Sequence, residues 1–385
     1  MLQRPGGAGA TPYGEIVRLP SRSSLRGRPS PRRLRDLVLF LALPLAIVPP
    51  FLSYHYRRGL LGVDFERTLL PAARAVAAGA SPYPGFGYPP LAAFALTPFT
   101  LVPGPDIVFA ALLVAAVPAS LWLLGVRDWR CYGAAFLWTP VLAAVQTGNV
   151  TILLLLGTAI CWRRRDSLCG VAAAGGLAIA AKILCWPLLA WLAATRRVAA
   201  AVWTAAVAVA VTLALWGLLG FSGLAGYPAS LSRLGRSVAS DSYTVKAILV
   251  DAGVDPALAR AAWAAVALAA LVAAFLLGRR GDDRRAFGLA AFAMILASPI
   301  VWLHSYALLL APVAVMRPRL SPAWLVPIAF VLVPGTGNGE AWQTATALGV
   351  AASTVALALA PEGRRQAAAP AALDPRASTT MPRPR

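Results

Sequence analysis

Asp64 is the carboxylate best placed for chemistry. It lies about ten residues beyond the first long apolar run, in the segment Gly-Val-Asp64-Phe-Glu66-Arg67. A carboxylate at that depth could act as a general base and accept the proton of an attacking sugar hydroxyl group. The alternatives are a solvated loop acid or an ion-pair partner of Arg67, because acidic side chains are mostly found on protein surfaces.

Lys182 is the strongest single signal. It lies in Ala-Ile-Ala-Ala-Lys182-Ile-Leu-Cys-Trp-Pro187, inside an otherwise unbroken apolar stretch. A cation there is costly unless it is paired or faces a watery cavity, so a functional role is the default expectation. A phosphate group is a natural partner. The alternative is a side chain that extends to the membrane surface, which a break between Lys182 and Pro187 disfavours.

Three further polar residues lie at the ends of apolar runs. Gln146 and Asn149 flank a turn and could hydrogen-bond substrate hydroxyls, or they could simply form a polar turn between helices. His304 follows Ser298-Pro299 and could hydrogen-bond a phosphate or a substrate hydroxyl, or it could be a structural histidine. All three are candidate substrate-binding residues.

Two tyrosines lie in a stiff, proline-rich segment, residues 82–90. Tyr83 and Tyr88 could stack on sugar rings. They could equally anchor the chain at the membrane interface, where aromatic residues are enriched.

Metal-binding residues are sparse. The chain has two histidines and four cysteines, and no two cysteines form a Cys-x-x-Cys pair. We therefore expect no metal site and no cofactor, and we interpret the cysteines as small buried hydrophobic residues.

The elements that must position these residues are membrane helices. The chain has 385 residues, of which 59% are hydrophobic and only 13% charged, with a mean hydropathy of +0.68. Soluble domains carry about 25% charged residues. The net charge of +20 comes from short arginine clusters between apolar runs, a pattern typical of membrane topology signals. Nucleic acid is therefore excluded as a partner.

The basic residues predict the orientation. Of the 35, 26 lie in the two tails and one set of loops, whereas the alternate loops hold seven. Because cytoplasmic loops are enriched in basic residues, we expect a multi-pass plasma-membrane protein with both termini in the cytoplasm. Every candidate site residue then falls at the outer face, and two long outer loops, near 54–90 and 221–256, would shape the site.

The predicted organisation is an all-α transmembrane bundle over residues 37–360, between disordered cytoplasmic tails at 1–36 and 361–385. We expect about twelve spans. Several have only 13–16 residues, fewer than the roughly 20 needed to cross a bilayer, so they are interpreted as re-entrant pairs. The stretch 169–195 is expected to break near Lys182. The spans run near 37–54, 91–125, 133–147, 149–162, 169–182, 183–195, 198–220, 257–278, 286–301, 303–316, 320–334 and 341–360.

The order of these motifs resembles glycosyltransferase family 87, which contains bacterial mannosyltransferases of the GT-C class. The resemblance extends over roughly residues 55–310 and is carried by the Asp64 loop, Gly79-Ala-Ser-Pro-Tyr83, Tyr88-Pro-Pro, Gln146-Thr-Gly-Asn149, Gly175-Gly176 with Lys182 and Pro187, and Ser298-Pro-Ile-Val-Trp-Leu-His304. It implies a GT-C-type helical bundle, a polyprenyl-phosphate-linked mannose as donor, inversion at the anomeric carbon, and Asp64 at the position of the family's first-loop catalytic aspartate.

The expected function is therefore a membrane glycosyltransferase. It would move a hexose, mannose by the resemblance, from the lipid-linked donor to a glycolipid or cell-envelope glycan acceptor, with Lys182 and His304 holding the donor phosphate. The alternative is a transporter or flippase for a lipid-linked saccharide. That alternative predicts internal symmetry and charges in the middle of several spans, and the sequence has neither. A non-catalytic scaffold is disfavoured by the resemblance.

Overall fold

The computed structural model describes residues 30–238, 241–333 and 340–361. Across these residues the chain forms helices and no strands, which confirms the all-α prediction. In chain order the elements are α1 (Pro31–Leu37), η2 (Val38–Ala42), α2 (Leu43–Arg57), η3 (Phe65–Leu69), α3 (Leu70–Ala77), α4 (Pro90–Ala95), η4 (Thr97–Leu101), α5 (Pro105–Leu123), α6 (Trp129–Phe136), α7 (Thr139–Thr147), α8 (Thr151–Arg163), α9 (Leu168–Ala181), η5 (Ile183–Cys185), α10 (Pro187–Ala194), α11 (Val198–Leu218), α12 (Tyr227–Ser237), α13 (Val245–Asp251), α14 (Pro256–Arg279), α15 (Asp283–Leu296), η6 (Leu303–Leu309), α16 (Leu310–Met316), α17 (Pro322–Leu325), η7 (Val326–Leu332) and α18 (Ala341–Leu359).

Within the described residues, five helices are long and apolar enough to cross a membrane. The pair α7 and α8 is bent by 115° at its break and would add a sixth span if counted as one. The count of about twelve is not confirmed. Many of the shorter predicted runs form helices such as α9, whose 14 residues span about 21 Å, less than the roughly 30 Å hydrocarbon core. The five helices are Pro31–Arg57, α5, α11, α14 and α18.

Several boundaries differ from the prediction. The first helix begins at Pro31 rather than near Leu37, and Ser30 caps it by accepting a hydrogen bond from the Arg33 amide. The predicted span 91–125 is divided into α4, η4 and α5, because Gly104 adopts a left-handed backbone at φ +59°. Both long loops contain helices. The tails were predicted to be disordered over 1–36 and 361–385. That prediction is wrong for residues 31–36, which form most of α1, whereas 1–29 and 362–385 lie outside the described residues.

The break at Lys182 is confirmed. Helix α9 ends at Ala181, and Lys182 has an extended backbone before η5 and α10 resume the helical path. Two glycines let α9 pack directly on α11: a Cβ at Gly175 would lie 2.8 Å from Thr204 Cγ2, and one at Gly176 would lie 2.6 Å from Val207 Cγ1. This close approach fixes where Lys182 emerges from the bundle.

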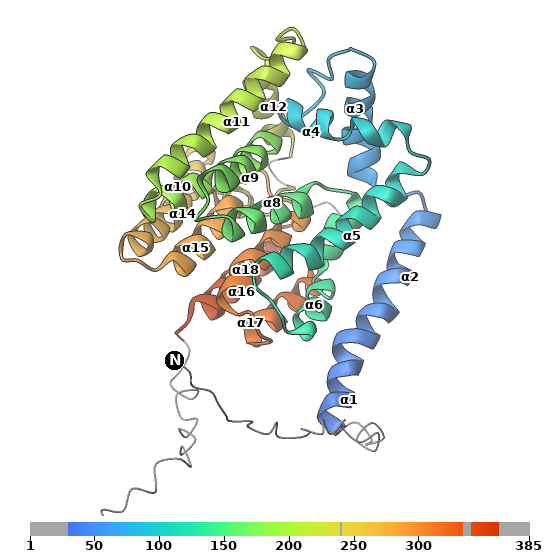
Figure 1. Cartoon of the computed structure of the whole chain (residues 1–385), viewed down its shortest axis with the longest axis vertical. Coiled ribbons are helices and arrows are strands. Elements are labelled where there is room, and N and C mark those ends of the chain that lie inside the picture. The colour runs from blue at the N-terminus through green and yellow to red at the C-terminus, as the bar shows by residue number, and fades with distance from the viewer. Residues whose placement is uncertain (1–29, 239–240, 334–339, 362–385) are drawn as a thin grey trace, which may run out of the picture.

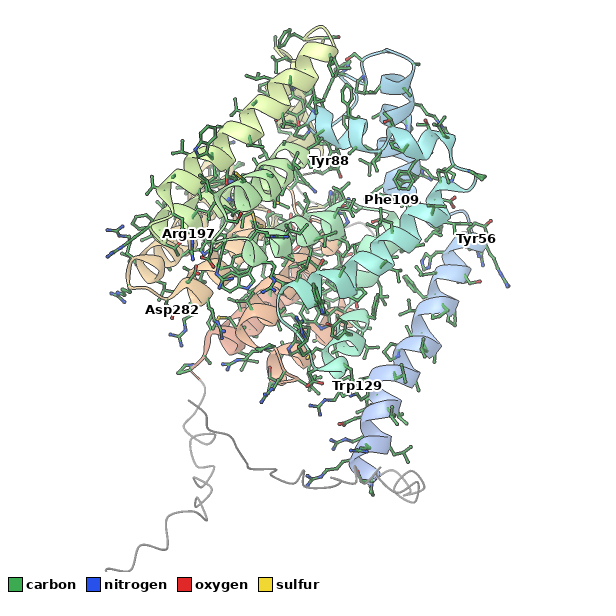
Figure 2. All side chains as sticks on the ribbon, viewed as in Figure 1. Tyr56, Tyr88, Phe109, Trp129, Arg197 and Asp282 are labelled. Carbon is green, nitrogen blue, oxygen red and sulfur yellow. The ribbon has the colours of Figure 1, made fainter. Side chains whose placement is uncertain are left out.

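The basic loops that the charge count assigns to one side gather at one end of the bundle. Asp283 accepts hydrogen bonds from Trp191 Nε1 at 2.7 Å and from Arg197, and it pairs with Arg165 at 3.3 Å. In Figure 2, Arg197 and Asp282 lie at the left of the bundle and Trp129 lies at the bottom, whereas Tyr88 lies in the upper part. The assignment of the basic end to the cytoplasm stays a prediction.

The first span lies at the edge of the bundle, where Figure 1 shows α1 and α2 as a nearly separate rod. It contacts α6 closely, since a Cβ at Gly133 would lie 1.8 Å from the Phe40 carbonyl oxygen. Three of the four cysteines are buried as predicted, but Cys169, at the start of α9, is exposed.

Candidate active site

Asp64 lies in a tight reversal between α2 and η3. Gly59 and Gly62 adopt left-handed backbones at φ +64° and +72°, which turn the chain back after the first span. The end of α7 braces this turn: the Gly62 amide donates to the Gln146 carbonyl at 2.6 Å, and Gln146 Nε2 donates to the Leu60 carbonyl. Gln146 therefore positions the loop that carries Asp64, and it also lines the cavity described below.

Gly148 allows the α7–α8 turn to approach Asp64. It ends α7 in the left-handed conformation at φ +68°, and a Cβ there would lie only 2.7 Å from Phe65 Cβ. Phe65 is fully buried and stacks on Phe109 with ring centroids 4.5 Å apart. The residue after Asp64 is thus locked in the core, while Asp64 itself is half-buried.

Asn149 orients the Asp64 carboxylate. Its Nδ2 donates to Asp64 Oδ2 at 2.9 Å and lies 3.3 Å from the Tyr88 hydroxyl. Its Oδ1 accepts from both the amide and the hydroxyl of Thr151, at 3.1 and 2.8 Å. Because Thr151 occupies the oxygen, the amide NH₂ must face Asp64. Among the described residues, the other carboxylate oxygen has no hydrogen-bond partner.

Tyr88 and Tyr83 behave differently. Tyr88 lies against Asn149 and Asp64, and burial together with the Asp64 charge raises the pKa of its phenol, which therefore stays protonated. Tyr83 is turned away. Its ring stacks on Trp216 at 4.2 Å, and its hydroxyl donates to the Tyr88 carbonyl at 2.8 Å. Tyr83 thus positions Tyr88, and neither tyrosine lines the cavity itself.

Lys182 reaches the same place from the break after α9. Its Nζ lies 5.3 Å from the centroid of the Tyr88 ring, a cation–π contact. It interacts electrostatically with Asp64, but within the described part of the chain no carboxylate lies within 4.0 Å of it. This half-buried cation therefore has no ion-pair partner of its own there.

A cavity of about 480 Å³ opens beside Asp64. Its walls come from α2, the Asp64 turn, α7, the segment before α13 and the start of η6. The lining is mostly apolar and aromatic, with a few polar groups, as is usual for small-molecule sites. The lining residues are Phe51, His55, Asp64, Thr139, Leu142, Ala143, Gln146, Thr147, Tyr243, Trp302, Leu303 and His304.

His304 forms part of the wall in η6. It is only 6% exposed, and its Nε2 has no hydrogen-bond partner among the described residues. It interacts electrostatically with Lys182. The structure thus brings Asp64, Lys182 and His304 together from three distant parts of the chain.

Several cavity residues were missed from the sequence. His55, near the end of α2, was considered only as a possible metal ligand, and its Nδ1 lies 2.8 Å from the Phe51 carbonyl oxygen. Tyr243 lies in the second long loop, which was predicted only as a whole to shape the site, and Trp302 lies in a segment whose polar signal was assigned to His304. Within the described residues, no group of three or more His, Cys, Asp or Glu side chains could hold a metal ion.

Residues 86–299 match the model of glycosyltransferase family 87. No curated protein and no solved structure matches the chain. The matched segment contains Tyr88, Asn149 and Lys182. Asp64 and His304 lie outside it, but the Asn149–Asp64 hydrogen bond joins Asp64 to it, and His304 lies near Lys182.

Proposed function

The chain belongs to glycosyltransferase family 87 and is a membrane glycosyltransferase, and we propose that it transfers mannose from a polyprenyl-phosphate donor to a glycolipid or cell-envelope glycan. Transfer proceeds with inversion at the anomeric carbon in a bundle of the GT-C class. The enzyme acts at the outer face of the plasma membrane, and both of its termini are cytoplasmic. No cofactor takes part.

Asp64 is the general base in this proposal. One carboxylate oxygen is held by Asn149, and the side chain borders the cavity, so the other oxygen is available to an acceptor hydroxyl. As that hydroxyl attacks the anomeric carbon, its proton passes to Asp64. Glu66 is exposed and follows Asp64 by two residues along a helix, where side chains point apart. It is therefore not the base.

Lys182 stabilises the leaving group. When the bond between the anomeric carbon and the phosphate oxygen breaks, the electron pair stays on that oxygen, and the donor phosphodiester leaves as a phosphomonoester with one more negative charge. An unpaired cation beside Asp64 and His304 supports this role, because charge that develops in the transition state is stabilised best by groups already in place. His304 lies next to Lys182 and holds the donor at the same end.

One observation carries the proposal. The Asn149–Asp64 hydrogen bond ties the candidate base to the segment that matches the family. The transporter or flippase alternative relied on Lys182 alone, and membership in a glycosyltransferase family supports the enzyme instead. Gln146, Tyr83 and Tyr88 support the site by bracing the Asp64 turn and by carrying the ring over Lys182.

The test is a transfer assay on the purified full-length protein. Radiolabelled polyprenyl-phosphate mannose, glucose and galactose are offered with extracted envelope glycolipids, and nucleotide-linked mannose forms a parallel arm. We expect label to move from polyprenyl-phosphate mannose, with the anomeric configuration inverted in the product. Transfer from nucleotide-linked mannose but not from polyprenyl-phosphate mannose would contradict the proposal. The absence of transfer from every donor would contradict it as well.

A further inference from the structure

Tyr243 has a rigidly held backbone. It lies in the segment between α12 and α13, and its amide donates to the Val301 carbonyl at 2.8 Å. The Val301 amide in turn donates to Ser242 Oγ at 2.9 Å, and the Tyr306 hydroxyl donates to the Tyr243 carbonyl at 2.9 Å. These bonds dock the second long loop on the extended segment before η6 and fix the position of the Tyr243 backbone.

The Tyr243 hydroxyl, by contrast, is unpaired within the part of the chain that the structure describes. The residue is 2% exposed and lines the cavity that also contains Asp64 and His304. Among the described residues, no group hydrogen-bonds its Oη. Leaving a buried hydroxyl unpaired is energetically unfavourable. Burial raises the pKa of the phenol, so the group keeps its proton and can donate.

The surroundings favour a neutral ligand with hydroxyl groups. Trp302 and apolar side chains such as Leu142 and Leu303 form much of the wall, whereas Lys182 is not part of the lining. A phosphate would need a cation beside the phenol. A sugar ring needs an aromatic or apolar surface and a few precisely placed hydrogen-bonding groups. Two residues that line the cavity, Tyr243 and His304, each have a buried polar atom with no hydrogen-bond partner among the described residues.

We propose that the Tyr243 hydroxyl is a sugar-binding group, which donates a hydrogen bond to a hydroxyl of the hexose that occupies this cavity. The inference rests on the proposed function because it takes the substrate to be a sugar. The position of the Tyr243 hydroxyl does not depend on that proposal. The hexose belongs either to the donor or to the acceptor, and kinetics distinguish the two.

The test compares Tyr243→Phe with Tyr306→Phe in the full-length protein. Both substitutions remove one buried hydroxyl, but within the described residues the Tyr306 hydroxyl has a hydrogen-bond partner and the Tyr243 hydroxyl has none. We expect Tyr243→Phe to keep or raise the Tm, because no bond within the protein is lost. It should raise the KM of one substrate by about tenfold or more. Tyr306→Phe should lower the Tm. A higher KM for the lipid-linked donor assigns the hexose to the donor, and a higher KM for the acceptor assigns it there.

Two results would overturn the inference. One is a KM within about twofold of wild type for both substrates in an active Tyr243→Phe enzyme, which would leave the proposed function intact. The other is a Tm loss as large as that of Tyr306→Phe, which would reveal a structural partner. If the wild-type protein transfers no sugar, saturable binding of octyl hexopyranosides decides instead. Weaker binding by Tyr243→Phe supports the inference, and equal binding or no binding to wild type rejects it.

Discussion

Asn149 Nδ2 lies 2.9 Å from Asp64 Oδ2, although 85 positions separate the two residues in the chain. The bond joins the turn between α7 and α8 to the turn after the first span. It also occupies one of the two Asp64 carboxylate oxygens, because Thr151 holds the Asn149 oxygen and leaves the Asn149 NH₂ for Asp64. The proposed chemistry depends on this orientation.

Replacing Asn149 with leucine should slow transfer. The change keeps the side-chain volume nearly constant but removes a hydrogen bond to a charged group, worth about 1.5–3 kcal/mol. We expect kcat to fall about 10- to 100-fold with a smaller change in donor KM, measured by steady-state transfer. Thr151→Val is the matched variant, because it removes the hydroxyl group that donates to Asn149 Oδ1. It should give a smaller loss of kcat in the same direction. Wild-type kcat in Asn149→Leu would show that the bond does not matter for catalysis.

Gly148→Ala should destabilise the protein and impair transfer. The left-handed backbone alone costs about 1–2 kcal/mol for a residue with a Cβ, and the new Cβ would lie 2.7 Å from Phe65 Cβ. Gly59→Ala is the control, because Gly59 has a similar φ of +64° and open space around it. Thermal unfolding in detergent should give a larger Tm loss for Gly148→Ala than for Gly59→Ala. Equal losses of Tm would mean that the close approach of residue 148 to Phe65 does not affect stability.

Lys182→Met should abolish binding of the lipid-phosphate donor while the protein still inserts. The variant removes the cation and keeps an extended apolar side chain. Lys246→Met, in α13, is the matched control, since Lys246 is the only other lysine in the chain. Donor affinity can be measured by equilibrium binding of a short-chain polyprenyl-phosphate mannose. Unchanged donor affinity in Lys182→Met would show that Lys182 does not bind the donor phosphate.

The predicted orientation is testable with two cysteines. Gly85 is exposed, and a Cβ there would meet nothing within 4 Å, so Gly85→Cys is a benign probe of the first long loop. Cys169 is a natural exposed reporter near the basic loop before α9. An impermeant maleimide applied to intact cells should label Gly85→Cys and leave Cys169 unlabelled until the membrane is permeabilised. The reverse pattern would invert the topology.

The site residues that could be predicted from the sequence are those whose polarity is conspicuous. Asp64, Asn149 and Lys182 stand out in an apolar chain, and the structure brings them together. Tyr243 could not be found this way, because it is one of nine tyrosines and its unpaired hydroxyl exists only through the docking of its backbone on Val301. Tyr83 was expected to meet a sugar, but nothing in the sequence signals its stacking on Trp216.

The fold was predictable in type but not in its count of spans. Apolar runs and glycine or proline breaks locate most helix ends, including the end of α9 at Ala181. They do not tell whether a short apolar helix crosses the bilayer or turns back within it, since the same apolar residues lie in the membrane in both arrangements. The pair α7 and α8, with a 115° bend between them, illustrates this. Together the two helices are long and apolar enough for one span, although neither is alone.

The central claim, that Asp64 is the general base, is tested most directly by the transfer rate of Asp64→Asn beside Glu66→Gln. Asparagine keeps the size and can still hydrogen-bond, but it cannot accept the proton of the acceptor hydroxyl. With saturating polyprenyl-phosphate mannose and acceptor, Asp64→Asn should bind donor normally and lose at least about a hundredfold in kcat, whereas Glu66→Gln should retain most activity. A near-normal rate in Asp64→Asn, or a dead Glu66→Gln, would contradict this account.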